Sequence, residues 1–210
     1  MEAPQTTAQQ VLQIVHETGG VRARDLTARG LSPTHLQRLY EQGLILRSGR
    51  GVYLPADAEI SENSSLAEVA LRIPAGIVCL LSALQFHGLT TQSPHQVWIT
   101  LPLRAHTPRQ GYPPVRVVHM SGEALTEGIQ TTQIGRVPVR IYSPAKTVAD
   151  CFKFRNKIGL DVALEALQEC RRKQQVSLDE LWLYARICHV GSVMRPYLES
   201  LSLSNTCSQR

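Results

Sequence analysis

The pattern of apolar and polar positions predicts three short helices and then a β-hairpin at the start of the chain. Apolar residues recur on one helical face over 7–18, and a second short helix is expected around 24–28. A third helix is expected to begin at Ser32-Pro33, because a hydroxyl caps the first turn and proline there loses no hydrogen bond. Gly43 is expected to end this helix.

The third helix is predicted to bury a stripe formed by Leu36, Leu39 and Tyr40, which follow the i, i+3, i+4 spacing of one helical face. Its opposite face lacks the Glu/Lys pairs that are typical of a merely solvated helix. The side chains expected there are those of Thr34, Gln37, Arg38 and Glu41. The outward face of this helix is therefore predicted to contact a partner.

Two apolar runs, 44–46 and 52–54, flank a segment rich in arginine and glycine at 47–51. They predict a β-hairpin, and three helices followed by a basic hairpin are typical of a winged helix-turn-helix. The polar, proline-containing segment 55–65 separates this part from the rest of the chain. We therefore expect a winged helix-turn-helix domain over 1–60.

Helical and strand patterns alternate beyond that limit, which predicts an α/β domain over 61–210 with a small sheet and several C-terminal helices. Helices are expected at 65–72, 76–88, 143–154, 160–174, 178–188 and 193–201. Strands are expected at 96–101, 115–120, 131–134 and 137–142, and a proline-rich loop is expected at 102–114. The fold class predicted for the whole chain is mixed, α+β or α/β.

Composition fits a globular protein, since 43% of the 210 residues are hydrophobic and 19% are charged. The formal net charge of +5 favours polyanionic partners only weakly. Its placement says more. Residues 20–53 contain six arginines against two acidic residues, a local net charge of +4, whereas residues 1–60 taken together are neutral. The positive charge of the first domain is thus confined to the helices and hairpin expected to face a partner.

These side chains suit contact with DNA. The guanidinium of Arg38 can pair with the edge of guanine, and the amide of Gln37 with that of adenine. Arginines of a hairpin can contact backbone phosphates or enter a minor groove. The candidate DNA-binding residues are Arg22, Arg24, Thr34, His35, Gln37, Arg38, Arg47, Ser48 and Arg50. Two other interpretations stay open: helices that only pack a core, and a module that docks protein.

A second basic cluster lies in residues 136–157, where six basic residues face one acidic residue, a net charge of +5. The six are Arg136, Arg140, Lys146, Lys153, Arg155 and Lys157. They could form a solvated helix face. They could also form a second basic surface, on DNA beside the winged helix or on another polyanion such as RNA.

No pattern predicts catalysis, a metal site or a cofactor. Ser143-Pro-Ala-Lys146 matches the S-x-x-K motif of penicillin-recognising enzymes, but their other motifs are lacking and Ser-Pro is an ordinary helix start. Neighbouring cysteines and histidines lack zinc-ligand spacing. The polar N-terminal residues, the odd count of five cysteines and the lack of a long apolar run predict a cytoplasmic protein with reduced thiols and no membrane segment.

Three blocks of sequence are similar to one known family. GLILRSGRGVYLP resembles the wing of the AbiEi family of type IV antitoxins, and CLLSALQFHGLT followed by VWITLP resembles its next block. IYSPAKTVADCFKFRNKIGLDVALEAL resembles the third block, a Ser-Pro followed by two helices. The blocks follow in family order, and the resemblance covers about residues 7–200.

The resemblance implies a bacterial antitoxin that represses its own promoter by binding inverted repeats in double-stranded DNA through the winged helix. It implies that Thr34, Gln37, Arg38, Arg47 and Arg50 read the promoter. The C-terminal domain would counteract a nucleotidyltransferase-like toxin without requiring a stable complex. We expect a non-enzymatic protein that binds the repeats as cooperating monomers or as a dimer, with the monomer slightly favoured. The alternatives are an interaction module that directly inhibits a partner, with the winged helix docking protein, and, third, a nuclease.

Overall fold

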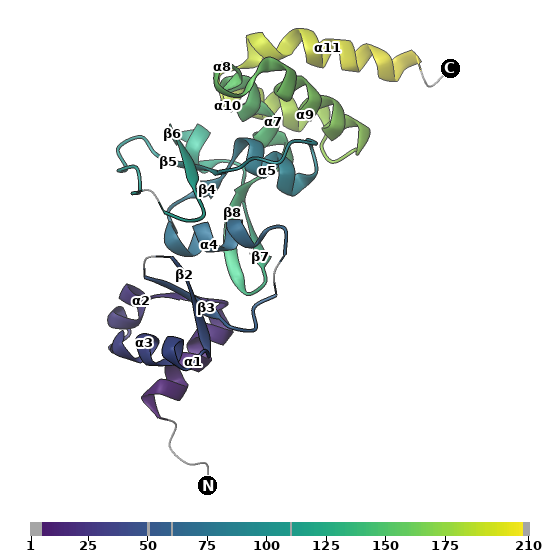
Figure 1. The fold of residues 1–210 in the computed structure, drawn as a ribbon. Helices are drawn as coiled ribbons and strands as arrows, with labels where there is room; N and C mark the ends of the chain where they lie inside the picture. Colours follow the sequence, from purple (N-terminus) through teal and green to yellow (C-terminus); the bar gives the residue numbers. More distant parts are fainter. Residues whose placement is uncertain (1–5, 50, 60, 110, 208–210) are drawn as a thin grey trace. The chain divides into compact units, whose positions relative to one another are not determined.

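The computed structural model describes residues 6–49, 51–59, 61–109 and 111–207. The fold is mixed α+β, with helices and small sheets in two compact units (Figure 1). The first unit comprises Met1–Gly76, His106–Arg116 and Thr131–Arg140. The second comprises Ile77–Ala105, Val117–Gln130 and Ile141–Arg210. The first unit therefore reaches past the limit expected at residue 60 and takes in two later segments.

The described residues at the start of the first unit form α1 (Thr7–Thr18), β1 (Val21–Arg22), α2 (Ala23–Ala28), α3 (Thr34–Glu41), β2 (Ile45–Gly49) and β3 (Val52–Pro55). The strands form an antiparallel sheet in the order β1-β3-β2. The helices and sheet enclose a core of Val11, Val15, Val21, Leu26, Leu36, Leu39, Ile45 and Tyr53. This order of elements is compatible with a winged helix.

The boundaries of α1 follow from its sequence. Thr6 and Gln9 form a capping box, in which the Gln9 amide donates to Thr6 Oγ1 and the Thr6 amide donates to Gln9 Oε1. The helix ends at Gly19, which adopts a left-handed φ of 69°. The expected helix over 7–18 is confirmed at both ends.

Two expectations for the first unit are wrong. Helix α3 begins at Thr34 with Pro33 in the capping position, because Ser32 Oγ contacts the Thr34 side chain and amide instead of capping a helix begun at Pro33. Tyr40 does not join the buried stripe, since 43% of its surface is exposed. Strand β1 was not expected, because two residues carry no strand pattern of their own and form a strand only by pairing with β3.

Helix α4 (Ser64–Arg72) also belongs to the first unit. A second sheet has the strand order β6-β5-β4-β8-β7, where β4 pairs antiparallel with β5 and parallel with β8. Its strands are β4 (Ile77–Val78), β5 (Val97–Pro102), β6 (Val115–Met120), β7 (Ile129–Ile134) and β8 (Val137–Tyr142). Strand β6 has the expected bounds, and the expected hairpin of β7 and β8 is present.

The remaining helices are α5 (Leu80–His87), α6 (Glu123–Thr126), α7 (Pro144–Lys153), α8 (Arg155–Ile158), α9 (Leu160–Arg172), α10 (Leu178–Ile187) and α11 (Gly191–Cys207). Helix α7 is central to the second unit, because it packs against α5, α9 and α10 and all its residues from Ala145 to Phe152 are buried. The short elements β4, α6 and α8 were not expected. Over the described residues, no helix is both long and apolar enough to span a membrane.

Candidate nucleic-acid interface

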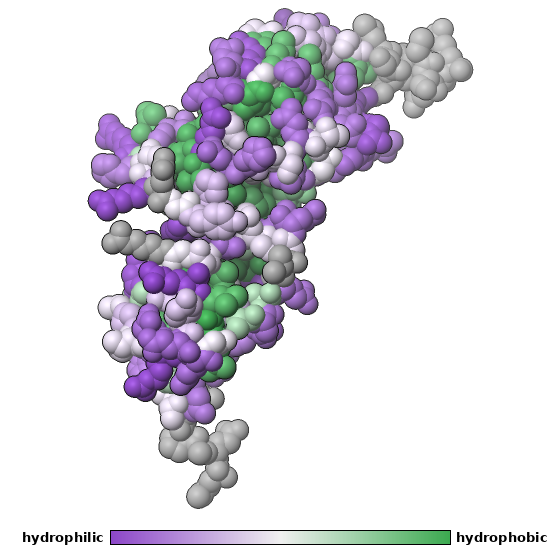
Figure 2. All heavy atoms as spheres, viewed as in Figure 1, coloured by the Kyte–Doolittle hydropathy of each residue, from purple (hydrophilic) through white to green (hydrophobic). Residues whose placement is uncertain are grey.

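Helix α3 separates a buried face from a polar exposed face. Leu36 and Leu39 are 0% and 3% exposed and pack into the core of the first unit. The exposed side chains of the helix include Thr34, Gln37, Arg38 and Glu41. Figure 2 shows that the surface over α2 and α3 is mostly hydrophilic or neutral in this view. Of the residues predicted to contact DNA, three thus share one accessible helix face.

Gln37 and Glu41 are linked on that face. Gln37 Nε2 donates to Glu41 Oε1 at 2.9 Å, one helical turn away. The bond occupies one of the two amide protons of Gln37 and leaves its carbonyl oxygen available, which still permits the donor and acceptor pair that reads adenine. His35, next to them in sequence, is half-buried.

Arg22 is committed to an ion pair and is a weak candidate for contact with DNA. Its Nε and Nη2 donate to the two carboxylate oxygens of Asp25 at 2.6 and 2.7 Å, and only 18% of its side chain is exposed. This bidentate pair ties Arg22, the capping residue of α2, to the first turn of that helix. Arg24 is exposed on α2 and is the better candidate of the two.

The hairpin of β2 and β3 presents Arg47 to solvent. The neighbouring Ser48 is half-buried and its hydroxyl donates to Glu68 of α4, so it supports the hairpin instead of facing outward. Arg50 lies outside the described residues. The accessible set on described residues is therefore Arg24, Thr34, Gln37, Arg38 and Arg47.

Comparison with known proteins shows that the segment carrying this surface is similar to a known family. Residues 9–56 match the family model described as "Transcriptional regulator, AbiEi antitoxin". That stretch runs from the first turn of α1 to the end of β3 and contains every exposed candidate named above. We call this stretch, which is similar to the AbiEi antitoxin family, the AbiEi segment. The resemblance noted in the sequence is confirmed over these residues, and the family they resemble is one of transcriptional regulators.

A solved structure shares the fold over most of the chain. The crystal structure of the RV2827C protein from Mycobacterium tuberculosis superposes with a TM-score of 0.56 and 17% sequence identity, covering 89% of this chain and 73% of that chain. At this identity the likeness concerns the fold alone. No curated protein matches the chain.

Outside the AbiEi segment, the structure removes one residue, Lys146, from the second basic cluster predicted over 136–157. Lys146 is 0% exposed and cannot belong to any surface, because its ammonium is buried against Asp150. Arg136 and Arg140 lie in the first unit, whereas Lys153, Arg155 and Lys157 lie in the second. Several of these cations have internal partners: Arg136 Nη1 donates to the His16 carbonyl at 2.9 Å, and Arg155 Nη1 donates to the Phe152 carbonyl at 2.9 Å.

The buried polar group of the second unit surrounds Asp150. Lys146 Nζ donates to both carboxylate oxygens at 2.6 Å and lies 4.0 Å from the centre of the Tyr142 ring. Cys188 Sγ donates to Asp150 Oδ1 at 3.3 Å. Burial raises the pKa of Asp150 and raises the pKa of the Cys188 thiol to about 12, so the thiol stays protonated. With Lys146 and Asp150 inaccessible, this group supports the core and offers no route to a substrate.

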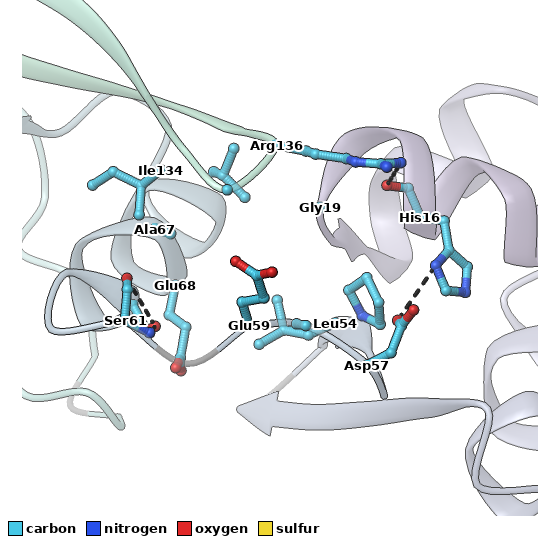
Figure 3. A pocket seen from close by; sticks show the side chains of 15 residues that line it. His16, Gly19, Leu54, Asp57, Glu59, Ser61, Ala67, Glu68, Ile134 and Arg136 are labelled. Carbon is cyan, nitrogen blue, oxygen red and sulfur yellow. Dashed lines mark hydrogen bonds and ion pairs between the residues drawn. The ribbon is translucent and has the colours of Figure 1, made fainter.

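A pocket of about 440 Å³ opens within the first unit between the end of α1, the segment after β3, α4 and the turn of β7 and β8 (Figure 3). Figure 3 shows the Asp57 carboxylate facing the His16 ring, with Oδ1 3.5 Å from Nδ1, and the Arg136 guanidinium reaching the His16 carbonyl. Asp57, Glu59 and Glu68 make the lining acidic, which disfavours a polyanion. No cluster that could hold a metal occurs among the described residues.

Proposed function

We propose that this protein is an autoregulatory transcriptional repressor that binds double-stranded DNA through residues 9–56, folded as a winged helix-turn-helix. Helix α3 would lie in the major groove and the hairpin of β2 and β3 would act as the wing. The observation that carries the proposal is a coincidence: the residues that match a family of transcriptional regulators also present Thr34, Gln37 and Arg38 on one accessible helix face.

The division of labour follows from the chemistry of each side chain. Arg38 would pair with a guanine edge and Gln37 with an adenine edge, which supplies specificity. Arg24 and Arg47 would neutralise phosphates, which supplies affinity without reading sequence. The binding sites would be inverted repeats in the protein's own promoter, occupied by monomers that cooperate.

The rest of the chain, the expected domain 61–210, would carry the antitoxin activity and counteract a nucleotidyltransferase-like toxin without a stable complex. Support comes from the family, whose members are antitoxins, and from the resemblance of the later sequence blocks. We propose no catalytic residue, metal or cofactor for this role, since the buried Lys146 and Asp150 are inaccessible.

The test of DNA recognition is a titration of a duplex taken from directly upstream of the protein's own gene. Arg38→Ala should weaken binding by about 5- to 150-fold and relax specificity at one base pair, since a bidentate pair is worth about 1–3 kcal/mol. Arg186→Ala, which removes an exposed arginine of α10, is the matched control and should bind as the unmodified protein does. Unchanged binding by Arg38→Ala would refute the assignment of α3.

A second function, a module that docks protein and directly inhibits a partner, has one observation in its favour. Tyr40, Leu44 and Leu46 are 43%, 43% and 52% exposed and follow one another from the end of α3 into β2. Exposed apolar groups of this size favour contact with protein. Co-purification with the neighbouring gene product in high salt would support this function, and retention of that complex with a Leu46→Glu variant would count against it.

A further inference from the structure

We propose that the segment His106–Arg116 forms a second DNA-backbone contact beside the hairpin of β2 and β3, with Arg109 and Tyr112 as its phosphate ligands. This inference rests on the proposed function, because it extends the surface that would bind DNA. It assigns a binding role to a segment that lies outside the residues matched to the AbiEi family.

The segment is held in place by α4. Arg72, in the last turn of that helix, donates through Nη1 to the Tyr112 carbonyl at 2.8 Å and through Nη2 to the Pro113 carbonyl at 2.6 Å. Glu68, one turn earlier on α4, accepts a hydrogen bond from the hydroxyl of Ser48 in β2. One helix therefore anchors both the hairpin and the segment, and all three belong to the first unit.

The hairpin and the segment also touch directly. A Cβ atom added at Gly49, the last residue of β2, would lie 3.3 Å from the Tyr112 carbonyl oxygen. That separation is below ordinary van der Waals contact, so any larger residue at 49 would press on the segment. The Tyr112 backbone thus lies beside Gly49, which follows the exposed Arg47 by two positions along β2.

The charge of the segment itself suits a polyanion. It contains Arg109 and Arg116 and neither aspartate nor glutamate. Within the segment, Arg109 is exposed, and Tyr112 is 72% exposed while Pro113 beside it is buried. The exposed phenol of Tyr112 is therefore accessible to a partner, and its backbone is fixed by the two bonds from Arg72.

Phosphate is the partner that these two side chains fit best. The guanidinium of Arg109 can donate two parallel hydrogen bonds to phosphate oxygens, and the phenol of Tyr112 can donate one more. Such contacts fix the position of a protein on a duplex without reading its sequence. Because the segment adjoins the hairpin, it would hold the backbone next to the stretch contacted by Arg47.

The salt dependence of binding tests this role. Two duplexes serve as probes, the DNA upstream of the gene and a scrambled sequence of the same length. Arg109→Ala should flatten the slope of log K against log salt by about 0.9 on both, so that the loss of affinity between 50 and 200 mM salt shrinks about threefold. Tyr112→Phe should weaken binding to both duplexes equally. Arg186→Ala is the matched control and should change neither the slope nor the affinity.

The anchor provides a separate variant. Arg72→Met removes both bonds to the segment and should flatten the slope as Arg109→Ala does, although Arg72 itself would not touch DNA. Thermal unfolding of each variant keeps a folding defect apart from a lost contact. The double variant Arg72→Met, Arg109→Ala should be no weaker than the weaker single variant, because both act through the same contact.

Photo-crosslinking locates the contact directly. Both cysteine variants are made with Cys207→Ser, so that the other native thiols are those of Cys79, Cys151, Cys170 and Cys188, which are buried and will not compete for the reagent. A thiol-reactive photo-crosslinker on Arg109→Cys should then join the protein to the upstream duplex, whereas the same reagent on Arg186→Cys should not. If the protein binds DNA and Arg38→Ala weakens it, but Arg109→Ala leaves the slope unchanged, this inference is wrong and the proposed function stands. If the unmodified protein binds neither duplex, the proposed function fails. If Arg186→Ala flattens the slope equally, net charge explains the effect and the inference is overturned.

Discussion

Lys146 and Asp150, one turn apart on α7, form an ion pair in which neither side chain has any exposed surface and both N–O distances are 2.6 Å. Two charges inside a core are costly to desolvate, and only close, hydrogen-bonded geometry offsets that cost. The stability of the fold should therefore fall if one partner is replaced by an apolar residue, and fall much less if both are replaced.

Asp150→Leu alone should lower the free energy of unfolding by about 3–5 kcal/mol, because it leaves the Lys146 ammonium buried without a counter-charge. The double variant Lys146→Met, Asp150→Leu should recover most of that loss. Urea titrations followed by circular dichroism would measure both. A double variant as unstable as Asp150→Leu would show that the pair contributes more than mutual neutralisation.

His87 should make stability depend on pH. His87 is the last residue of α5, and burial lowers the pKa of its imidazole. Its Nε2 lies 2.8 Å from the carbonyl oxygen of Tyr142, the last residue of β8. As the pH falls below about 6.5, the unfolded chain takes up a proton that the folded chain resists, so the free energy of unfolding should decrease by at most about 1.4 kcal/mol per pH unit.

The measurement is urea unfolding between about pH 7.5 and 5, across the ordinary pKa of histidine, for the unmodified protein and His87→Gln. The variant cannot take up that proton, so its stability should fall less steeply in the same window. Parallel curves for the two proteins would mean that other groups set the pH dependence.

Two glycines should differ in how much they tolerate alanine. Gly43 has φ of 72° with no atom within 4 Å of an added Cβ, whereas Gly128 has φ of 75° and its added Cβ would lie 2.8 Å from Lys146 Cβ. Gly43→Ala should cost about 1–2 kcal/mol from the left-handed backbone alone. Gly128→Ala should cost about 1–3 kcal/mol more from crowding. Thermal melts of the two variants would show the difference, and equal losses would contradict the close packing at Lys146.

Glu41 should oppose DNA binding by the proposed reading helix. Its carboxylate is exposed on the face of α3 and accepts a hydrogen bond from Gln37. Glu41→Gln keeps an acceptor for that bond and removes a charge that repels phosphate, so affinity for the upstream duplex should rise about two- to fivefold. A fall in affinity would instead show that the charge is needed to orient Gln37 or a nearby arginine.

The local sequence pattern predicted most of the helices and strands, but it did not predict which strands pair with one another. Helix α1 and strand β6 have the expected bounds, because a capping box, a terminal glycine and clear periodicity are signals carried by the elements themselves. Strands β1 and β4 have two residues each and form only by pairing with strands elsewhere in the chain. Strand β1 pairs with β3, and β4 pairs with β5 and β8.

For the candidate site, the sequence predicted which side chains of α3 are exposed, but it did not predict which of the other cations are buried or paired. The exposed face of α3 follows from helical spacing, so Thr34, Gln37 and Arg38 were identified correctly as accessible. Charge counting could not tell that Lys146 is buried, although a lysine four residues before an aspartate was a signal for an ion pair. The engagement of Arg22 by Asp25 has a similar short-range signal, whereas the contact of Ser48 with Glu68 spans twenty residues and has none.

The first unit draws on three separated stretches of the chain, which has a consequence during synthesis. The ribosome releases residues 9–56 well before it makes His106–Arg116 and Thr131–Arg140. A nascent chain stopped between these points holds the side chains proposed to read DNA but lacks the carbonyls that Arg72 binds. Translation therefore makes the residues proposed to face DNA first, and the unit that carries them is complete only once Arg140 has been added.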